Sequence, residues 1–124
     1  MKNYTVKPMS NIAQVGLDEL KGTSCNVHED SESPDGVLVR STKLSKEVIN
    51  DNLKAISRAG AGVNNIPVED CTEKGVVVFN TPGANANAVK ELVLAGLMLS
   101  SRNIFQSIDF VNNLSSMKDM EELE

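Results

Sequence analysis

The sequence contains no tryptophan, and aromatic residues account for only 3% of its 124 positions. The core must then be built from valine, leucine, isoleucine and alanine, which suits buried parallel strands. Cysteine is also scarce, because the chain has only Cys25 and Cys71, which lie far apart and match no CxxC or Cys/His spacing. This pattern argues against a secreted disulfide framework, predicts no metal site and indicates a reducing, cytoplasmic setting.

The sequence has fewer basic than acidic residues, with 12 lysines and arginines and 17 aspartates and glutamates, so that its formal net charge is −5. The chain therefore has no cationic field to attract nucleic acid or an anionic membrane surface. Long apolar runs are missing as well, because the longest, residues 92–99, falls far short of the ~20 residues that a membrane-spanning helix needs. The partner that fits is a small anion, which an arginine and backbone N–H groups can bind against the overall charge.

The chain does contain an alternation of short apolar segments with helix-like segments, joined by connections rich in Gly, Pro, Asn and Ser. This alternation is typical of a βαβ series and predicts an α/β fold with a parallel sheet of about five strands. The expected strands lie at residues 4–8, 25–28, 36–40, 55–58 and 76–80, and the expected helices between them at 12–21, 45–53 and 68–74.

The stretch SRAGAGVNNIPVED, residues 57–70, places two glycines where the fourth expected strand ends. A dinucleotide-binding turn needs the pattern G-x-G-x-x-G, with an acidic residue at the end of the next strand. Here Gly60 and Gly62 supply the first two glycines, but Asn65 stands at the third position. The acidic position falls near Asn80, which is neutral. The sequence therefore argues against a nicotinamide dinucleotide site at this loop.

The same loop has two other interpretations. Glycines after a strand permit positive φ and leave backbone N–H groups uncovered, so Ala61, Gly62 and Val63 could form a cradle for a carboxylate. Alternatively, the glycines only turn a corner, and Asn64 or Asn65 caps the helix that follows. The residues of the loop leave both interpretations open.

A second polar group follows the third expected strand, in the sequence GVLVRSTKL. Arg40 and Ser41 stand at the carboxyl end of this strand, which is the side of a parallel sheet where ligands bind. A guanidinium gives a carboxylate or phosphate two parallel hydrogen bonds, and the neighbouring hydroxyl adds another. An exposed arginine in a surface salt bridge is the alternative. His28, the single histidine, is expected to be structural or solvated at a strand end.

After Asn80 the pattern changes to a loop, NTPGANANAV, and then to a helix expected over residues 89–103. Between residues 92 and 99 this helix is apolar on nearly every face, which predicts that it is buried on all sides in its working state. The sequence that follows, a moderately amphipathic helix with an acidic tail, is too short to cover it. The partner of this helix is therefore expected outside these residues.

Taken together, VRSTKL and ISRAGAGVNNIPVEDCTEKGVVVFNTPGANANAVKELVLAGLMLSSRNI resemble the N-terminal substrate-binding domain of the D-isomer-specific 2-hydroxyacid dehydrogenases. The resemblance runs through most of residues 36–104. It implies a flavodoxin-like, three-layer domain over residues 1–85, then a crossover helix and linker over residues 86–124, leading to an NAD-binding domain outside this chain. It also implies NAD as the cofactor of the full enzyme, bound by that other domain, and a homodimer formed through the helix at 86–104.

The resemblance further implies a small anionic D-2-hydroxy acid as the substrate, with 3-phosphoglycerate, oxidised in serine biosynthesis, as the expected one. Arg40 and Ser41 match family positions near the substrate phosphate, and Gly60, Ala61, Gly62 and Val63 match the loop whose backbone holds the substrate carboxylate. Asn85 matches an asparagine at the cleft, whereas Asn64 replaces an acidic residue common in the family. The catalytic residues are expected outside this part of the chain, so that it is inactive alone.

A free-standing flavodoxin-like module for anion binding or signalling, such as a phosphoacceptor receiver, is the competing class. A receiver needs an acidic cluster after the first strand and an aspartate at the end of the third, where this sequence has KPMSN and VRST. Without those carboxylates neither Mg²⁺ nor a phosphoaspartate is supported. A dehydrogenase of another oxyacid, such as glycerate or lactate, would differ only in what faces Arg40 and Ser41.

Overall fold

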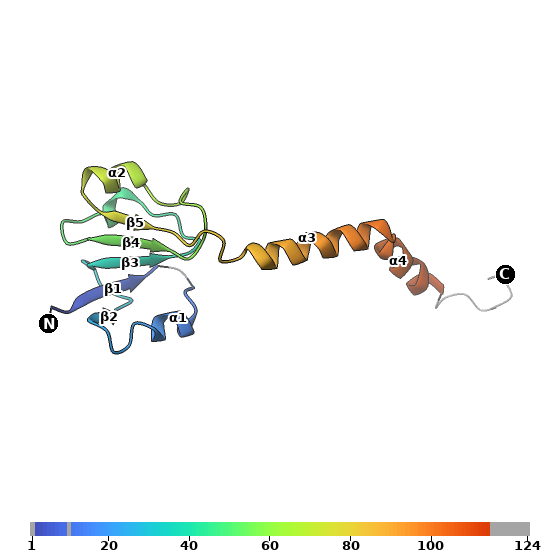
Figure 1. The fold of residues 1–124 in the computed structure, drawn as a ribbon, viewed down its shortest axis with the longest axis horizontal. Helices are drawn as coiled ribbons and strands as arrows, with labels where there is room; N and C mark the ends of the chain where they lie inside the picture. The colour runs from blue at the N-terminus through green and yellow to red at the C-terminus, as the bar shows by residue number, and fades with distance from the viewer. Residues whose placement is uncertain (1, 10, 115–124) are drawn as a thin grey trace. The chain divides into compact units, whose positions relative to one another are not determined.

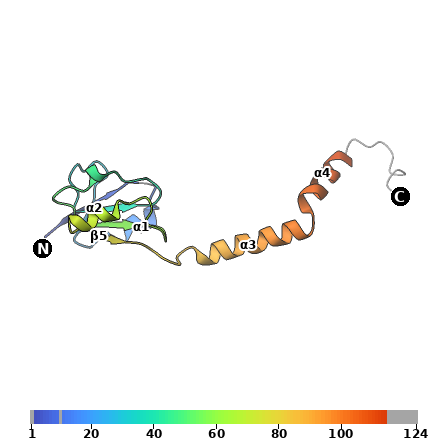
Figure 2. The same cartoon turned by 90° about the horizontal axis from the view of Figure 1, so that it is seen from above.

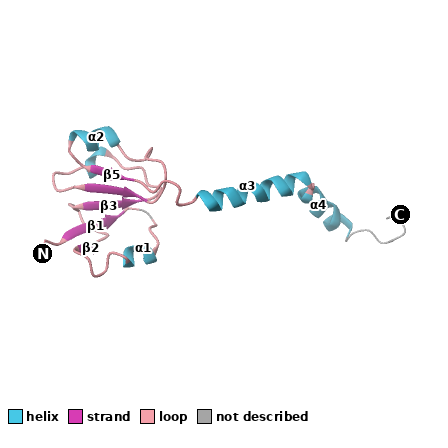
Figure 3. Ribbon diagram, viewed as in Figure 1, coloured by secondary structure: helices cyan, strands magenta, loops and turns pink. Residues whose placement is uncertain are grey.

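The computed structural model describes residues 2–9 and 11–114 and divides into two compact units, residues 1–84 and 85–124. The first unit is built on one sheet of five parallel strands in the order β2-β1-β3-β4-β5 (Figure 1). This is the flavodoxin-like order, and it confirms the α/β fold expected from the sequence. The strands, magenta in Figure 3, are β1 (Tyr4–Pro8), β2 (Cys25–Val27), β3 (Gly36–Val39), β4 (Ala55–Arg58) and β5 (Val77–Phe79).

The strand order changes direction between β1 and β3. From β1 the chain crosses to β2 on one side, and from β3 it proceeds through β4 to β5 on the other side. Because crossovers between parallel strands are right-handed, the connections on the two sides of this point cover opposite faces of the sheet. The segments that leave β1 and β3 therefore diverge, and doubly wound folds bind ligands in the crevice that such a divergence creates.

One face of the sheet carries the main core. Val37, Val39 and Ile56 are almost completely buried there, in one cluster with Cys71 of helix α2 (Val68–Glu73). Burial raises the pKa of the Cys71 thiol, so this cysteine is a packed and unreactive group. The remaining buried members of the cluster are Leu44, Leu53, Ile66 and Val76.

The opposite face is covered only in part. Helix α1 (Gln14–Asp18), shorter than the helix expected over residues 12–21, buries Leu17 beside β2. Val77 and Phe79 of β5 point to this face and are 52% and 56% exposed. Within the described residues the third layer of the expected three-layer arrangement is therefore thin, and it leaves the β5 side of this face open.

The prediction of a helix over residues 45–53 is wrong, because only a short 3-10 turn, η1 (Lys46–Val48), forms there. Asn50 explains the difference. Its side-chain Oδ1 accepts hydrogen bonds from the N–H groups of Asn52 and Leu53 at 2.9 and 3.1 Å. Such a side-chain turn competes with the hydrogen bonds of a helix.

The second unit contains helices α3 (Ala86–Ser101) and α4 (Ile104–Leu114), between which the chain bends at Asn103, a residue with φ 53° (Figure 2). Helix α3 begins and ends a little earlier than the helix expected over residues 89–103. Neither helix has a buried residue. No described helix is long and apolar enough to cross a membrane. The acidic tail, residues 115–124, lies outside the described residues.

Candidate functional site

The polar groups expected after β3 and after β4 lie side by side. The two strands pair in parallel with Val39 opposite Arg58, so the chain leaves both strands at the same edge of the sheet. The N–H of Ala59 donates to the carbonyl of Val39 at 2.8 Å, which continues the pairing one residue beyond β4. The structure therefore places residues 40–43, here called the arginine loop, next to residues 59–64, here called the glycine loop.

Asn65 ties the arginine loop to the end of the glycine loop. Its side chain donates from Nδ2 to the carbonyls of Thr42 at 2.8 Å and Arg40 at 3.4 Å, and its own carbonyl accepts from the N–H of Leu44 at 2.9 Å. The residue is only 8% exposed, and its Oδ1 is buried with no partner among the described atoms. A third glycine, as a dinucleotide turn requires, could make neither side-chain bond. The residue that breaks the glycine pattern thus joins the two loops.

Arg58, which sequence reasoning missed, lies against the glycine loop. Its Nε donates to the carbonyl of Arg40 and its Nη1 to the Oδ1 of Asn64, both at 3.1 Å. A Cβ on Gly60 would lie 3.3 Å from Nε, and one on Gly62 would lie 3.0 Å from Nη1. A side chain at either glycine would therefore displace this guanidinium by a few tenths of an ångström. Neither glycine uses the positive φ that glycine permits, which occurs in the described chain at Gly22, Gly75 and Gly83 among the glycines.

The end of β5 orients the peptide groups of the glycine loop. The Nδ2 of Asn80 donates to the carbonyl of Ala61 at 2.6 Å, and the N–H of Thr81 donates to the carbonyl of Gly60 at 3.0 Å. In a trans peptide the N–H points opposite to the carbonyl, so the N–H groups of Ala61 and Gly62 both face away from β5. Like the N–H of Val63, they donate to no other described residue, and all three residues are exposed. They are available to an outside acceptor.

The two loops carry positive charge and no carboxylate. Residues 40–43 and 57–65 contain Arg40, Lys43 and Arg58 but no aspartate or glutamate. Arg58 takes part in none of the ion pairs found in the described residues. One of those ion pairs lies at Asp35, whose pKa is held below its ordinary value by the hydrogen bond from Lys54. The two segments thus carry a positive formal charge, although the net charge of the chain is negative.

A cavity of about 470 Å³ opens where the segments leaving β1 and β3 diverge. Arg40 and Ala59 form one side of it, and the segment after β1 forms the other. The sequence singles out no residue of that segment. Its lining residues are Asn11, Ile12, Ala13, Val15 and Gly16.

The other residues singled out from the sequence lie as follows. Ser41 is exposed in the arginine loop. Asn85 stands at the N-cap position of α3 in the second unit, where its carbonyl accepts from the N–H of Val89 at 3.0 Å and its side chain makes no capping bond. His28 is exposed beyond the end of β2, as expected of a solvated residue. The described part of the chain has no group of three or more side chains able to hold a metal ion.

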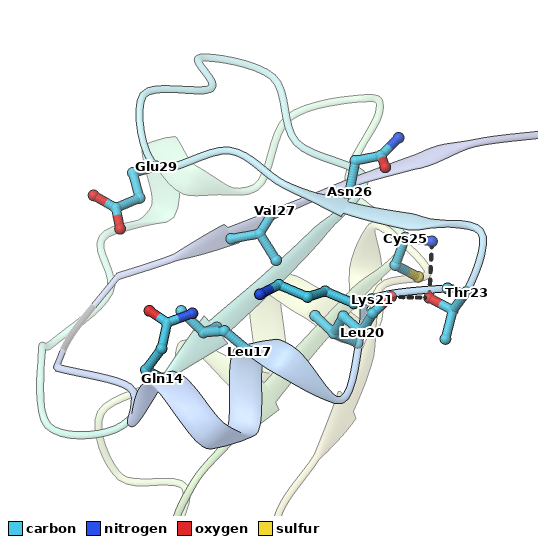
Figure 4. Close-up of a pocket in the computed structure, with 10 residues that line it drawn as sticks. Gln14, Leu17, Leu20, Lys21, Thr23, Cys25, Asn26, Val27 and Glu29 are labelled. Atoms are coloured by element: carbon cyan, nitrogen blue, oxygen red, sulfur yellow. Dashed lines mark hydrogen bonds between the residues drawn. The ribbon is translucent and has the colours of Figure 1, made fainter.

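A second hollow, of about 460 Å³, lies between α1 and β2 (Figure 4). Thr23 bonds to other residues of the lining, since its Oγ1 donates to the carbonyl of Leu20 at 2.7 Å and accepts from the N–H of Cys25 at 3.1 Å. Lys21 pairs with Asp18 at 2.7 Å. This hollow lies beside the edge strand β2, and we assign it no ligand.

The first unit is a flavodoxin-like α/β domain in which backbone N–H groups and guanidinium side chains lie at the carboxyl ends of β3 and β4. The family model for the D-isomer specific 2-hydroxyacid dehydrogenase catalytic domain matches residues 1–123. The chain belongs to this family.

Relatives of known sequence and structure agree with this assignment. A D-3-phosphoglycerate dehydrogenase of Methanocaldococcus jannaschii is 44% identical over 82 residues, which is 64% of this chain and 16% of the relative. A hydroxypyruvate reductase of Thermotoga maritima is 40% identical over 95 residues, 70% of this chain and 31% of the relative. The NAD⁺-bound 3-phosphoglycerate dehydrogenase of Entamoeba histolytica matches with a TM-score of 0.66 and 31% identity, covering 78% of this chain and 39% of that one. The chain thus spans only a fraction of the length of these relatives.

Proposed function

We propose that the chain is the substrate-binding part of an NAD-dependent D-2-hydroxyacid dehydrogenase that oxidises 3-phosphoglycerate to 3-phosphohydroxypyruvate, a step of serine biosynthesis. Relatives named D-3-phosphoglycerate dehydrogenase support this activity. The observation that carries the proposal is the pair of exposed N–H groups of Ala61 and Gly62, facing the same way beside the guanidinium of Arg58. A cytoplasmic setting fits the two free cysteines.

The role of these residues is to hold and orient the substrate. We assign the substrate carboxylate to the backbone N–H groups of residues 60–63 and the phosphate to Arg40 and Arg58, with Ser41 as a further hydrogen-bond donor. Hydrogen bonds to charged groups are about twice as strong as neutral ones, and a guanidinium binds a phosphate through two parallel bonds. Fixing both ends of a small acid aligns its carbinol carbon for reaction, and such alignment can lower a barrier by several kcal/mol. We also propose that Asn85 contributes to the substrate cleft of the full enzyme.

The described residues do not fit NAD at the glycine loop. Asn65 fills the third glycine position with a buried side chain, and Asn80, at the position of the acidic ribose ligand, is engaged with the carbonyl of Ala61. We therefore propose that a separate domain of the full enzyme binds NAD and supplies the catalytic residues. His28 is exposed beyond β2 and is given no catalytic role.

We propose that residues 1–85 form the substrate-binding domain and that residues 86–124 form the crossover helix and the start of a linker to the cofactor domain. The exposed apolar side chains of α3 support a homodimer formed through residues 86–104. Large apolar surfaces of this kind are rare on soluble monomers and mark interaction sites. The exposed large apolar residues of α3 are Val89, Leu92, Val93, Leu94, Leu97, Met98 and Leu99.

Calorimetric titration of the 124-residue chain tests the substrate assignment. We expect 3-phosphoglycerate to bind more tightly than D-glycerate, D-lactate or inorganic phosphate, because it alone carries both a carboxylate and a phosphate. Replacing Arg40 with alanine should weaken 3-phosphoglycerate much more than D-glycerate, whereas the remote control Lys21→Ala should weaken neither. Equal losses for both acids would contradict the phosphate assignment. Equal binding of all four anions would favour a general anion-binding module.

A further inference from the structure

Asn80 follows β5 directly, and its side chain extends the contact between β5 and β4 after the paired residues of the two strands have ended. The last of these pairs is Ser57 with Phe79. Beyond it, the Nδ2 of Asn80 donates to the carbonyl of Ala61 at 2.6 Å. An ionised carboxylate at this position would have no proton to donate to a carbonyl. The amide therefore serves the glycine loop in a way that an acidic residue could not.

Two neighbouring peptide groups of the glycine loop each accept one hydrogen bond from the segment after β5. The carbonyl of Gly60 accepts from the backbone N–H of Thr81 at 3.0 Å, and the carbonyl of Ala61 accepts from the Asn80 side chain. Successive carbonyls of an extended strand point in opposite directions, whereas these two point to the same side. The N–H groups of the same two peptides, which belong to Ala61 and Gly62, therefore share the opposite side.

Successive N–H groups that point to one side form a concave donor site for an anion. Such a site needs both peptides to keep their orientation. Thr81 holds the first peptide through its own backbone, which no change of side chain removes. The second peptide, between Ala61 and Gly62, is held through the side chain of Asn80. A flip of this peptide would take Gly62 from its present φ toward the positive region, which glycine accepts at little cost.

We propose that Asn80 is a positioning residue that holds the peptide between Ala61 and Gly62 against this flip, so that both N–H groups meet one substrate carboxylate. This inference rests on the proposed function, because the carboxylate is that of the proposed substrate. It assigns Asn80 no contact with the substrate, since the residue acts through the orientation of one peptide group. The effect of Asn80 should therefore be the same for every acid with a carboxylate and absent for inorganic phosphate.

Calorimetric titration of the 124-residue chain with 3-phosphoglycerate, D-glycerate and inorganic phosphate tests this role. Asn80→Leu keeps the size of the side chain but removes its donor, so that the ligand itself must fix the peptide. We expect its affinity for both acids to fall by the same factor, about tenfold, while the affinity for inorganic phosphate is unchanged. Asn80→Ala should give the same losses. The matched control is Asn52→Leu, which removes an exposed amide whose Nδ2 donates to Ser33 Oγ at 2.7 Å, and it should leave all three affinities intact.

A second measurement reads the peptide orientation without any ligand. The distance between the Hα of Ala61 and the amide proton of Gly62, followed by the nuclear Overhauser effect, depends on the orientation of their shared peptide. In Asn80→Leu this distance should change, and saturating 3-phosphoglycerate should restore it. The corresponding distance between Gly60 and Ala61 should stay the same, because Thr81 still holds that peptide.

The outcomes separate this inference from the proposed function. An unchanged distance in the free Asn80→Leu chain, or undiminished affinity for both acids, would overturn the inference while the proposed function stands. A loss confined to 3-phosphoglycerate, or an equal loss in Asn52→Leu, would overturn it as well. If the unsubstituted chain binds neither acid, the proposed function fails and this inference fails with it.

Discussion

Replacing Asn65 with alanine should loosen the junction between the arginine loop and the glycine loop. The side chain is 8% exposed and donates two hydrogen bonds across this junction, at 2.8 and 3.4 Å. A net intramolecular hydrogen bond contributes about 0.5–1.5 kcal/mol, and the longer of these two belongs at the low end. Removing the buried Oδ1, which has no described partner, offsets part of the loss. We therefore expect the free energy of unfolding to fall by about 1–1.5 kcal/mol.

Thermal unfolding followed by circular dichroism measures this change. A loss of this size corresponds to a lower Tm by about 4–12 °C for a unit of this length. The matched control is Asn64→Ala, in which the neighbouring exposed amide is removed, and its Tm should change by less than about 3 °C. A Tm for Asn65→Ala as high as that of the control would refute the role of Asn65 as the bridge between the loops. The variant should also bind 3-phosphoglycerate more weakly, because the loops would no longer be held in one arrangement.

Three further changes test other parts of the structure. Gly62→Ala should change stability by less than about 1 kcal/mol, because the new Cβ meets the ends of flexible side chains; it should nevertheless weaken 3-phosphoglycerate, and unchanged affinity in calorimetry would contradict the close-approach argument. The hydrogen bond from Lys54 lowers the pKa of Asp35, so the stability that this pair contributes is present above about pH 4 and is lost as the pH falls through the folded pKa. In urea unfolding, Asp35→Asn should therefore have a lower free energy of unfolding than the unsubstituted chain at pH 7 but not near pH 2. A difference that does not depend on pH would count against this pair. In sedimentation experiments, Leu97→Glu should convert a dimer to a monomer. The control Val15→Glu changes a similarly exposed side chain outside α3 and should leave the dimer intact; Leu97 and Val15 are 60% and 71% exposed. The opposite pattern would place the interface elsewhere.

The sheet could be predicted from the sequence because each strand is a short apolar run between turn residues. The fourth expected strand, residues 55–58, has the bounds of β4 in the structure. Whether residues 45–53 form a helix could not be predicted from the sequence pattern, because the outcome depends on the orientation of the Asn50 side chain. A local hydrogen bond from that side chain overrides a helical pattern.

Some residues of the candidate site could be predicted from the sequence, and others could not. Arg40 and the glycine loop could be found from the sequence, since Arg40 ends the third expected strand and the glycine loop follows the fourth. Arg58 occupies the equivalent end position of β4, and the same reasoning could have identified it. The roles of Asn65 and Asn80 could not be predicted, because each acts on a loop that is distant in the sequence and close only after folding.

The most direct test of substrate binding at the two loops is an NMR titration of the isotope-labelled chain with 3-phosphoglycerate, with D-lactate and inorganic phosphate as controls. We expect the amide signals of Ala61, Gly62 and Val63 to shift together with the side-chain signals of Arg40 and Arg58, and the phosphorylated acid to cause the largest shifts at the lowest concentration. An absence of shifts in the two loops at millimolar 3-phosphoglycerate, or shifts confined to the hollow between α1 and β2, would contradict this expectation.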